Sequence, residues 1–303
     1  MRLGVGDDAA LLSCPAGREL VAAIDTLNEG VHFPPGSPPE SIGHRVLAVN
    51  LSDLAAMGAE PGWALLALAL PQAEEAWLTE FSRGLCALAR QWGVALVGGD
   101  TTAGPLSVTL QILGFVEPGT ALTRAGGHAG DVLFVSGTPG DAAAGLALEQ
   151  GRLSCRDGAA EQYLRRRFLY PTPRVRLGRL LREHASACID VSDGLLADAA
   201  KLGAASGCGV ELAYADVPVS AACLQALGEE QARTLALSGG DDYELCFSVQ
   251  PARVPQLLAA LPPAQWDYRR IGTLTASGTA AVLRDGNVMD FSRRGFEHFA
   301  APM

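Results

Sequence analysis

The sequence predicts an α/β (α+β) fold in two domains, and three observations predict it. Strand-like and helix-like segments alternate along both halves of the chain. With 303 residues, 49% of them hydrophobic, the chain is long enough for two sizeable cores. A glycine-rich stretch from Arg124 to Gly130 separates the halves. We therefore place the domains at residues 1–125 and 126–303.

The first half is predicted to contain four strands and two helices. Apolar residues follow a helical period over Pro39–Met57, and Gly58 can end that helix. A second helix, Ala73–Trp92, is stopped by Gly93. The predicted strands are Glu19–Asp25, Trp63–Leu70, Val94–Val97 and Leu106–Val116.

The second half restarts with a strand, followed by a glycine turn and a helix over residues 137–145. Thr172 is predicted as an N-cap with Pro173 at the first helical position, opening a basic helix that runs to His184. A further helix is expected over Gly194–Ser206. The predicted strands are Asp131–Ser136, Cys188–Val191, Glu244–Val249 and Tyr268–Leu274.

Composition limits the classes of partner. The formal net charge of −10 argues against nucleic acid, which requires a basic face. The chain shows no signal peptide, and its apolar runs are far shorter than a bilayer span, so we expect a cytoplasmic protein without a membrane partner. Its seven cysteines are scattered and none forms C-x-x-C, which makes a zinc site improbable and fits a reducing compartment.

Six short segments place carboxylates beside glycines and hydroxyls. Such hard oxygen ligands on glycine-rich turns suit Mg²⁺ that carries phosphates. The only lysine is Lys201, and no G-x-x-x-x-G-K-[ST] motif occurs, so a phosphate site must use metal, backbone N–H groups and arginine. The segments are Gly4–Asp8, Ala23–Thr26, Asn50–Asp53, Gly98–Thr102, Ile189–Gly194 and Ser238–Glu244.

Two carboxylates in the first half stand out. Asp25 ends a predicted strand, where ligand sites of α/β folds commonly lie. Asp53 shares a helix face with Asn50 in an otherwise apolar helix, which favours a polar site at a buried interface over a solvated stripe. The segments around Asp8 and Asp100, taken alone, are explained as well or better by ordinary turns.

Ile189–Gly194 carries the sharpest single signal. A strand ends and a helix begins there, and the helix N-terminus offers free N–H groups to an anion. For Asp193 alone, a role as the helix N-cap is a strong explanation, but it does not account for Asp190 or Ser192. His32 and Arg124 are also candidates for phosphate or ring contacts, although solvated or structural roles are the usual ones for such single residues.

Taken together and in order, these segments resemble the thiamine-monophosphate kinase family from Gly4 to Phe299. The resemblance rests on Gly4–Leu12, Asp25–Phe33, Ala48–Ala59, Val97–Ser107, Ile189–Leu195 and Ser238–Leu245. It implies an ATP-dependent kinase that converts thiamine monophosphate to thiamine diphosphate. It also implies an aminoimidazole ribonucleotide synthetase-like fold, a homodimer formed through the N-terminal sheets, and ATP in a cleft between domains and subunits.

The resemblance further implies roles for particular residues. It implies no dedicated catalytic base, because the acceptor is itself a phosphate. It implies several Mg²⁺ ions, with ATP as co-substrate. The implied metal ligands are Asp8, Asp25, Asp53, Asp100, Asp190 and Asp193; the implied ATP contacts are Gly99, Asp100, Arg124 and Ser192; the implied substrate contacts are His32, Asp241 and Phe296.

Three departures from the family pattern bear on function. Ala23-Ile24 stands where the family usually has Ser-Thr, and Asp241 replaces a Glu. The chain also begins only a few residues before Gly4–Asp8, where the family has some twenty more. Two alternative functions therefore stay open: another ATP-dependent synthetase of the same superfamily, and a homologue that binds nucleotide or thiamine phosphate without turnover.

Overall fold

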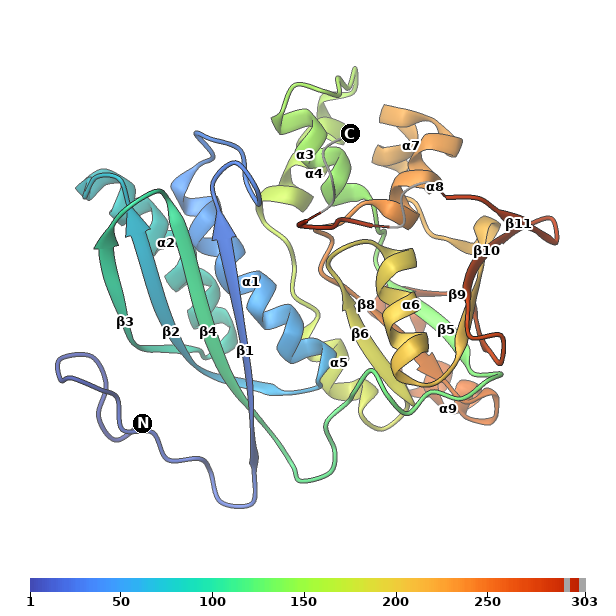
Figure 1. The fold of residues 1–303 in the computed structure, drawn as a ribbon, viewed down its shortest axis with the longest axis horizontal. Helices are drawn as coiled ribbons and strands as arrows, with labels where there is room; N and C mark the ends of the chain where they lie inside the picture. Colours follow the sequence, from blue (N-terminus) through green and yellow to red (C-terminus); the bar gives the residue numbers. More distant parts are fainter. Residues whose placement is uncertain (292–294, 300–303) are drawn as a thin grey trace.

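The computed structural model describes residues 1–291 and 295–299, and its two β-sheets come from the two halves of the chain (Figure 1). The first sheet is built before residue 117 and the second after residue 131. In the described parts of the chain, no helix combines the length and apolar character that crossing a membrane requires.

The first sheet has the strand order β1-β4-β2-β3, with β2 and β3 parallel and the other neighbours antiparallel. Helices α1 and α2 cover one of its faces. The bounds are β1 Glu19–Asn28, α1 Pro39–Ala56, β2 Glu60–Leu70, α2 Glu75–Trp92, β3 Ala95–Ala103 and β4 Ser107–Val116.

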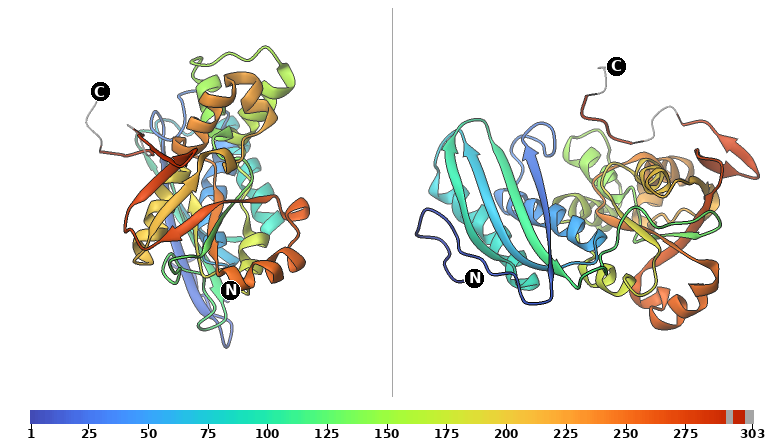
Figure 2. Two further views of the ribbon diagram at one scale, coloured as in Figure 1. Left: turned by 90° about the vertical axis from the view of Figure 1, so that its right-hand side faces the viewer. Right: turned by 60° about the horizontal axis from the view of Figure 1, so that its bottom comes forward.

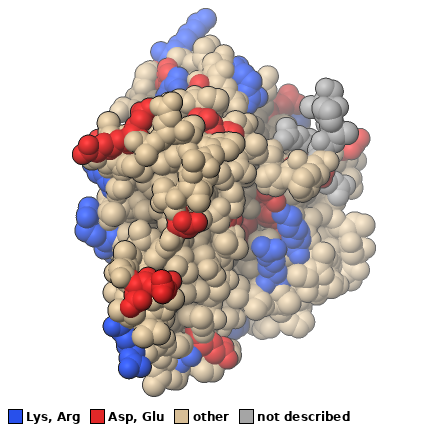
Figure 3. Space-filling model, turned by 60° about the vertical axis from the view of Figure 1, so that its left-hand side comes forward, with Lys and Arg blue, Asp and Glu red and all other residues tan. Residues whose placement is uncertain are grey.

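Alternation along β1 separates the two faces of this sheet. Val21, Ala23 and Leu27 pack against the helices. Leu20 and Ile24 point the other way and are 52% and 63% exposed. On this open face, Ala10 and Leu12 of the N-terminal segment pack against a small cluster around Trp63. Figure 2 shows that segment alongside the sheet, and Figure 3 shows only scattered charges on this side of the molecule.

The second sheet has seven strands in the order β11-β10-β7-β9-β5-β8-β6. Its strands are β5 Val132–Ser136, β6 Ala187–Val191, β7 Gly209–Ala213, β8 Glu244–Val249, β9 Tyr268–Thr275, β10 Ala280–Arg284 and β11 Asn287–Met289. The helices of this half are α3 Asp141–Glu149, α4 Gly158–Leu169, α5 Val175–Leu181, α6 Leu195–Ala205, α7 Ala221–Leu227, α8 Glu229–Ser238, α9 Val254–Ala260 and α10 Pro263–Trp266.

Helix α1 joins the two halves, because it is buried on nearly every side. It packs against the first sheet, α2 and α5, and it also contacts β6 and β8 of the second sheet. Glycines permit the closest approach to α2: a Cβ on Gly43 would lie 2.0 Å from the Phe81 carbonyl oxygen, and one on Gly84 would lie 1.9 Å from that of Glu40. One continuous core therefore contains residues from both sheets.

Most predicted elements are present within a few residues of their expected bounds. Gly93 ends α2 in the left-handed conformation, with φ 69°. The N-cap prediction at Thr172 is wrong: α5 starts at Val175 after Arg174, without a side-chain cap. The glycine turn and helix predicted over residues 137–145 are both present, with α3 starting at Asp141 after Gly140. The sequence reasoning missed α4, α7–α10, β7, β10 and β11, which are short or lack a strong period.

Two predictions about strand ends are also wrong, and both bear on the site. Asp25 does not end its strand, because β1 continues to Asn28. Gly98–Thr102 is not a turn after a strand but part of β3, paired in parallel with β2. Asp193 is not the N-cap of α6; that position is Gly194, with φ 134°. In β1 and β3, pairing with the neighbouring strands extends the strand beyond the apolar run that indicated it.

Candidate active site

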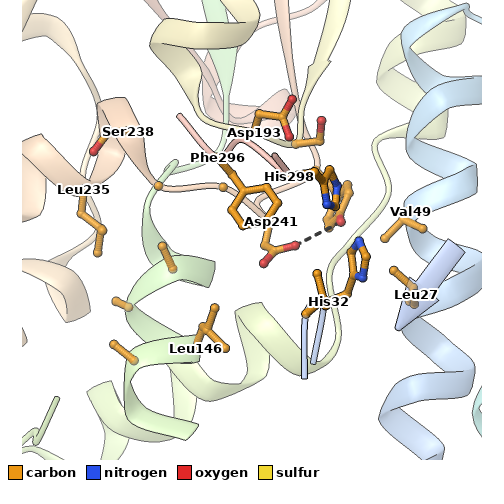
Figure 4. Close-up of a pocket in the computed structure, with 18 of the residues that line it drawn as sticks. Leu27, His32, Val49, Leu146, Asp193, Leu235, Ser238, Asp241, Phe296 and His298 are labelled. Carbon is orange, nitrogen blue, oxygen red and sulfur yellow. Dashed lines mark hydrogen bonds between the residues drawn. The ribbon is translucent and has the colours of Figure 1, made fainter. Parts of the chain in front are cut away.

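A cavity of about 1060 Å³ lies where the two halves of the chain meet, and most of the predicted site residues line it (Figure 4). Strand β1, helix α1, the turn after β6, the loop before β8 and the segment 296–299 all contribute to its wall. The predicted residues that line it are Asp25, His32, Asp53, Asp190, Ser192, Asp193, Asp241 and Phe296.

Three carboxylates from separate elements meet on one wall. Asp25 on β1 and Asp53 on α1 share a side-chain hydrogen bond. Burial raises the pKa of Asp53 to about 8, and the charges of Asp190 and Asp25 contribute to that rise. The pKa of Asp25 is raised by burial, while the hydrogen bond to Asp53 opposes that shift. Two carboxyl groups share a hydrogen bond only when one of them carries a proton. When both are ionised, the two negative charges repel each other.

Asp190, at the end of β6, completes the group and is 5% exposed. Burial raises its pKa to about 7, aided by the charge of Asp198 and opposed by a hydrogen bond from Ser52. The Ser52 hydroxyl donates to Asp190 Oδ2 at 2.9 Å. The positive charge of Arg124 lowers the pKa of both Asp53 and Asp190, which places the predicted ATP-binding arginine near this wall although it does not line the cavity.

The turn between β6 and α6 is not the open anion site that the sequence suggested. The backbone N–H groups of Ser192, Asp193 and Gly194 all donate to Asp198 Oδ2, at 3.0, 2.9 and 3.2 Å. Asp198 lies in the first turn of α6 and replaces the predicted cap. Lys201 donates to Asp198 Oδ1 at 2.7 Å and pairs with Asp193 Oδ2. The chain's single lysine therefore lies beside the site, which the sequence reasoning did not foresee.

The two acidic turns of the second half lie against each other. The backbone N–H of Asp241 donates to the Ser192 carbonyl at 2.8 Å, and that of Tyr243 donates to Val191 at 2.8 Å. Gly240 permits this contact, since a Cβ there would lie 2.5 Å from the Ser192 oxygen. The side chain of Asp242 turns away and accepts from the N–H groups of Gly140 and Ala142 at the start of α3. Asp242 therefore supports the loop, while Asp241 faces the cavity.

Aromatic and imidazole rings form another part of the cavity lining (Figure 4). The ring of His298 lies 5.2 Å from that of His32 and 4.9 Å from that of Phe296, centroid to centroid. The Phe296 N–H donates to the Asp193 carbonyl at 2.9 Å, which ties this segment to the acidic turn. The sequence reasoning identified His32 and Phe296 but missed His298, whose only signal is its spacing from Phe296.

The protonation of His32 follows from its contacts. Burial lowers its pKa, and the neighbouring His298 lowers it further, so the ring is mostly neutral at pH 7. Its Nδ1 accepts the Asn28 backbone N–H at 3.0 Å. The neutral ring therefore carries its proton on Nε2, as a donor for a ligand oxygen.

Three predicted residues lie apart from this cavity within one chain. Asp8 is exposed in the N-terminal segment. Gly99 and Asp100 lie on β3, at the opposite edge of the sheet from β1, three strand spacings or about 14 Å away. Asp100 also shares a row with Thr109 and Thr26, whose side chains bond to each other on the open face, whereas Asp25 faces α1.

Gly99 has a structural reason to be glycine. Its φ is 155°, and a Cβ there would lie 1.9 Å from the Leu66 carbonyl oxygen on the neighbouring strand. Asp100 accepts the backbone N–H of Thr101 at 2.9 Å. In the same chain, Gly99 and Asp100 therefore do not line this cavity.

The donor chemistry of the carboxylate wall suits Mg²⁺, since Asp25, Asp53 and Asp190 offer only oxygen ligands and repel one another. Asn50, one turn before Asp53, has a buried Oδ1 with no hydrogen-bond partner in the described residues. Over residues 1–291 and 295–299, no group of three or more His, Cys, Asp or Glu side chains is arranged so that it could hold a metal ion. The ligand atoms of these residues are therefore of the kind that Mg²⁺ prefers, although the described side chains are not gathered around a single ion position.

Comparisons with known proteins agree with this arrangement. Residues 6–116 match the AIR synthase related protein N-terminal domain, and residues 128–284 match the corresponding C-terminal domain. The chain is 46% identical to the thiamine-monophosphate kinase of Escherichia coli strain K12 over 303 residues, which covers 100% of this chain and 93% of the relative.

Solved structures show the same likeness. The crystal structure of thiamine-monophosphate kinase from Stenotrophomonas maltophilia K279a superposes with a TM-score of 0.88 at 46% identity, covering 95% of this chain and 92% of that one. AaThiL complexed with AMPPCP and TMP superposes with a TM-score of 0.83 at 32% identity, covering 97% and 92%. With its two-domain AIR synthase-like fold, the chain belongs to the thiamine-monophosphate kinase family.

Proposed function

We propose that this protein transfers the γ-phosphoryl group of ATP to thiamine monophosphate, giving thiamine diphosphate. The observation that carries the proposal is the cavity itself, which is lined both by a wall of carboxylates and by a group of aromatic and imidazole rings. A heterocycle that carries a phosphate suits both parts of the lining: its ring can pack against the aromatic side chains, and its phosphate can bind Mg²⁺ held by the carboxylates. The relative AaThiL, which is 32% identical, has been solved with AMPPCP and TMP together.

The acceptor supplies its own nucleophile. A phosphate monoester has a second pKa of about 6 and is largely dianionic at neutral pH, so no catalytic base is required. The obstacle is repulsion between this dianion and the γ-phosphate, and transfer then depends on positioning and charge neutralisation. The absence of a predicted base and the abundance of carboxylates are consistent with direct in-line transfer.

Asp25, Asp53, Asp190 and Asp193 would hold Mg²⁺ at the cavity wall. Bound Mg²⁺ would supply neutralisation of the phosphate oxygens. Arg124 adds a permanent positive charge near the same wall. Ser192 would contact the nucleotide from the adjoining turn. The replacement of Ser-Thr by Ala23-Ile24 removes two hydroxyl ligands, so backbone carbonyls or water would complete the coordination.

The thiamine phosphate would lie toward the rings. His32 would donate from Nε2 to an oxygen of the substrate, and Phe296 would pack against a heterocycle. Asp241, which lines the same cavity as His32 and Phe296, would accept a hydrogen bond from the substrate.

A homodimer would account for the three predicted residues that lie apart from the cavity. The open face of the first sheet exposes Leu20 and Ile24 and carries Asp100. A second copy packed on this face would bring its own Asp8, Gly99 and Asp100 near the ATP site of the first. The proposed site is then shared between two chains.

The direct test is an assay of thiamine diphosphate formed from Mg-ATP and thiamine monophosphate. We expect turnover that is lost when EDTA removes divalent metal. Binding without turnover at high enzyme concentration would favour the non-catalytic alternative. Labelling of the protein by [γ-³²P]ATP alone would contradict direct transfer, because it would reveal a phosphoenzyme.

A further inference from the structure

Arg45 is a charged side chain held inside the core. It lies on α1 and its side chain is 2% exposed. Its Nη1 donates to the Phe168 carbonyl at 2.6 Å, and its guanidinium lies 4.4 Å from the Phe168 ring centroid and 5.6 Å from that of Tyr243. Among the described residues, Asp241 is the one carboxylate that pairs with it, through Nη2 and Oδ1. A buried charge of this kind strongly favours keeping its partner in place.

Asp241 is constrained from both its backbone and its side chain. Its φ of 73° is left-handed, a conformation that Asp tolerates better than most residues. Its N–H is bound to Ser192. Its Oδ1 accepts from Arg45 and, at 3.1 Å, from the Tyr243 hydroxyl. No described residue donates to Oδ2, while the side chain is 24% exposed and lines the cavity.

We propose that Arg45 is a positioning residue for the acceptor substrate. It fixes the Asp241 carboxylate so that Oδ1 is occupied and Oδ2 faces the cavity as a hydrogen-bond acceptor. The ligand group that this arrangement recognises is an N–H or O–H donor on a heterocycle, such as a ring amino group. The inference rests on the proposed function, and it assigns a role in substrate binding to Arg45, a residue of α1 that does not itself line the cavity.

Changing the lengths of the two side chains while keeping their charges tests whether Arg45 acts by positioning Asp241 or only by its charge. Arg45→Lys keeps the positive charge but loses the planar fork and shortens the reach. Asp241→Glu keeps the negative charge and adds one methylene. Each single variant misplaces the carboxylate, whereas the double variant restores the span between the two elements. Arg165→Lys on α4 is the matched control, because Arg165 pairs with Glu149 and Glu161 away from this cavity.

The experiment measures KM for thiamine monophosphate, KM for ATP and the Kd of thiamine monophosphate by calorimetry. For Arg45→Lys we expect KM and Kd for thiamine monophosphate to rise about tenfold, the equivalent of one lost hydrogen bond. The KM for ATP should change by less than about twofold, and Asp241→Glu should recover most of the loss in the double variant. Arg165→Lys should leave all three constants unchanged.

A purely structural role gives a different result. If Arg45→Lys lowers only the melting temperature and leaves the Kd of thiamine monophosphate at the wild-type value, the inference is overturned and the proposed function stands. If Arg45→Lys does not fold, Tyr243→Phe removes the other donor to Oδ1 and should raise the same Kd several-fold; an unchanged Kd there also overturns the inference. Wild-type protein that neither binds nor phosphorylates thiamine monophosphate would overturn the proposed function itself.

Discussion

The hydroxyl of Ser52 on α1 donates to Oδ2 of Asp190 on β6 at 2.9 Å, and both residues are buried. This hydrogen bond joins the helix layer of the first sheet to an edge strand of the second. It also orients a carboxylate that we propose as a metal ligand. Stability and site geometry are therefore coupled at this point.

Replacing Ser52 by Ala should destabilise the protein. The variant leaves a buried carboxylate oxygen without its donor, which costs about 1–3 kcal/mol. Thermal unfolding should show a melting temperature lower by several degrees. Ser41→Ala is the matched control, since Ser41 lies on the same helix but bonds only to the local Pro38 carbonyl. Equal effects of the two variants would contradict a special role for the Ser52 contact.

Stability should fall in acid through Glu244. Burial would raise its pKa, but the charges of Arg174 and Arg167 outweigh burial, and the pKa is lowered below 4.5. A lowered folded pKa contributes stability that is present above the unfolded pKa and is lost as pH falls through the folded value. Glu244→Gln should therefore be less stable than wild type at pH 7 by about 3–5 kcal/mol. The gap should narrow below pH 4 in urea titrations, and a constant gap would contradict the assignment.

Phe296→Ala should weaken binding of thiamine monophosphate. Loss of the ring contact is worth about 0.5–1.5 kcal/mol, so KM should rise up to about tenfold. Phe296→Trp should retain most of the affinity because it keeps an aromatic face. Steady-state kinetics with each substrate varied in turn provide the measurement. An equal rise in KM for ATP would indicate that Phe296 shapes the whole cavity instead.

Ile24→Lys should separate the proposed dimer. The side chain is 63% exposed on the open face of the first sheet, and a lysine there would bury a charge in the interface. Light scattering should give twice the 31.5 kDa chain mass for wild type and the single mass for the variant. Val288→Lys, an equally exposed apolar position on β11, should remain dimeric. A monomeric wild type would refute the shared site.

Asp53→Asn should raise the Mg²⁺ concentration needed for activity, on the order of tenfold or more, because an amide is a weaker ligand than a carboxylate. Calorimetry with Mg²⁺ alone provides a second readout that does not depend on turnover. Asp285→Asn is the control, because Asp285 lies in a distant left-handed turn that Asn also adopts. Unchanged Mg²⁺ dependence would remove Asp53 from the proposed ligand set.

Local sequence predicted the carboxylate wall better than the strands that carry it. Asp53 was found because its helix leaves no room for a solvated face, and it is indeed half-buried beside Asp25. The positions of Gly99 and Asp100 could not be predicted, because strand order and strand direction decide which edge and which face they occupy.

The residues that were missed act through other residues. Asp198 and Lys201 are ordinary helix residues in the sequence, and their role appears only when the turn before α6 folds back on them. Arg45 has no motif, since its partner Asp241 is 196 positions away. The domain boundary, the ligand roles and the cytoplasmic location remain predictions.

The burial of α1 between both sheets has a consequence for folding. The predicted boundary near residue 125 marks where the chain crosses between sheets, whereas the continuous core of α1 extends across it. Expressed alone, residues 126–303 would lack the helix that covers β6 and β8, and residues 1–125 would present that helix to water. The two halves should therefore unfold in a single cooperative transition. A destabilising substitution in either sheet should then lower the free energy of unfolding of the whole protein.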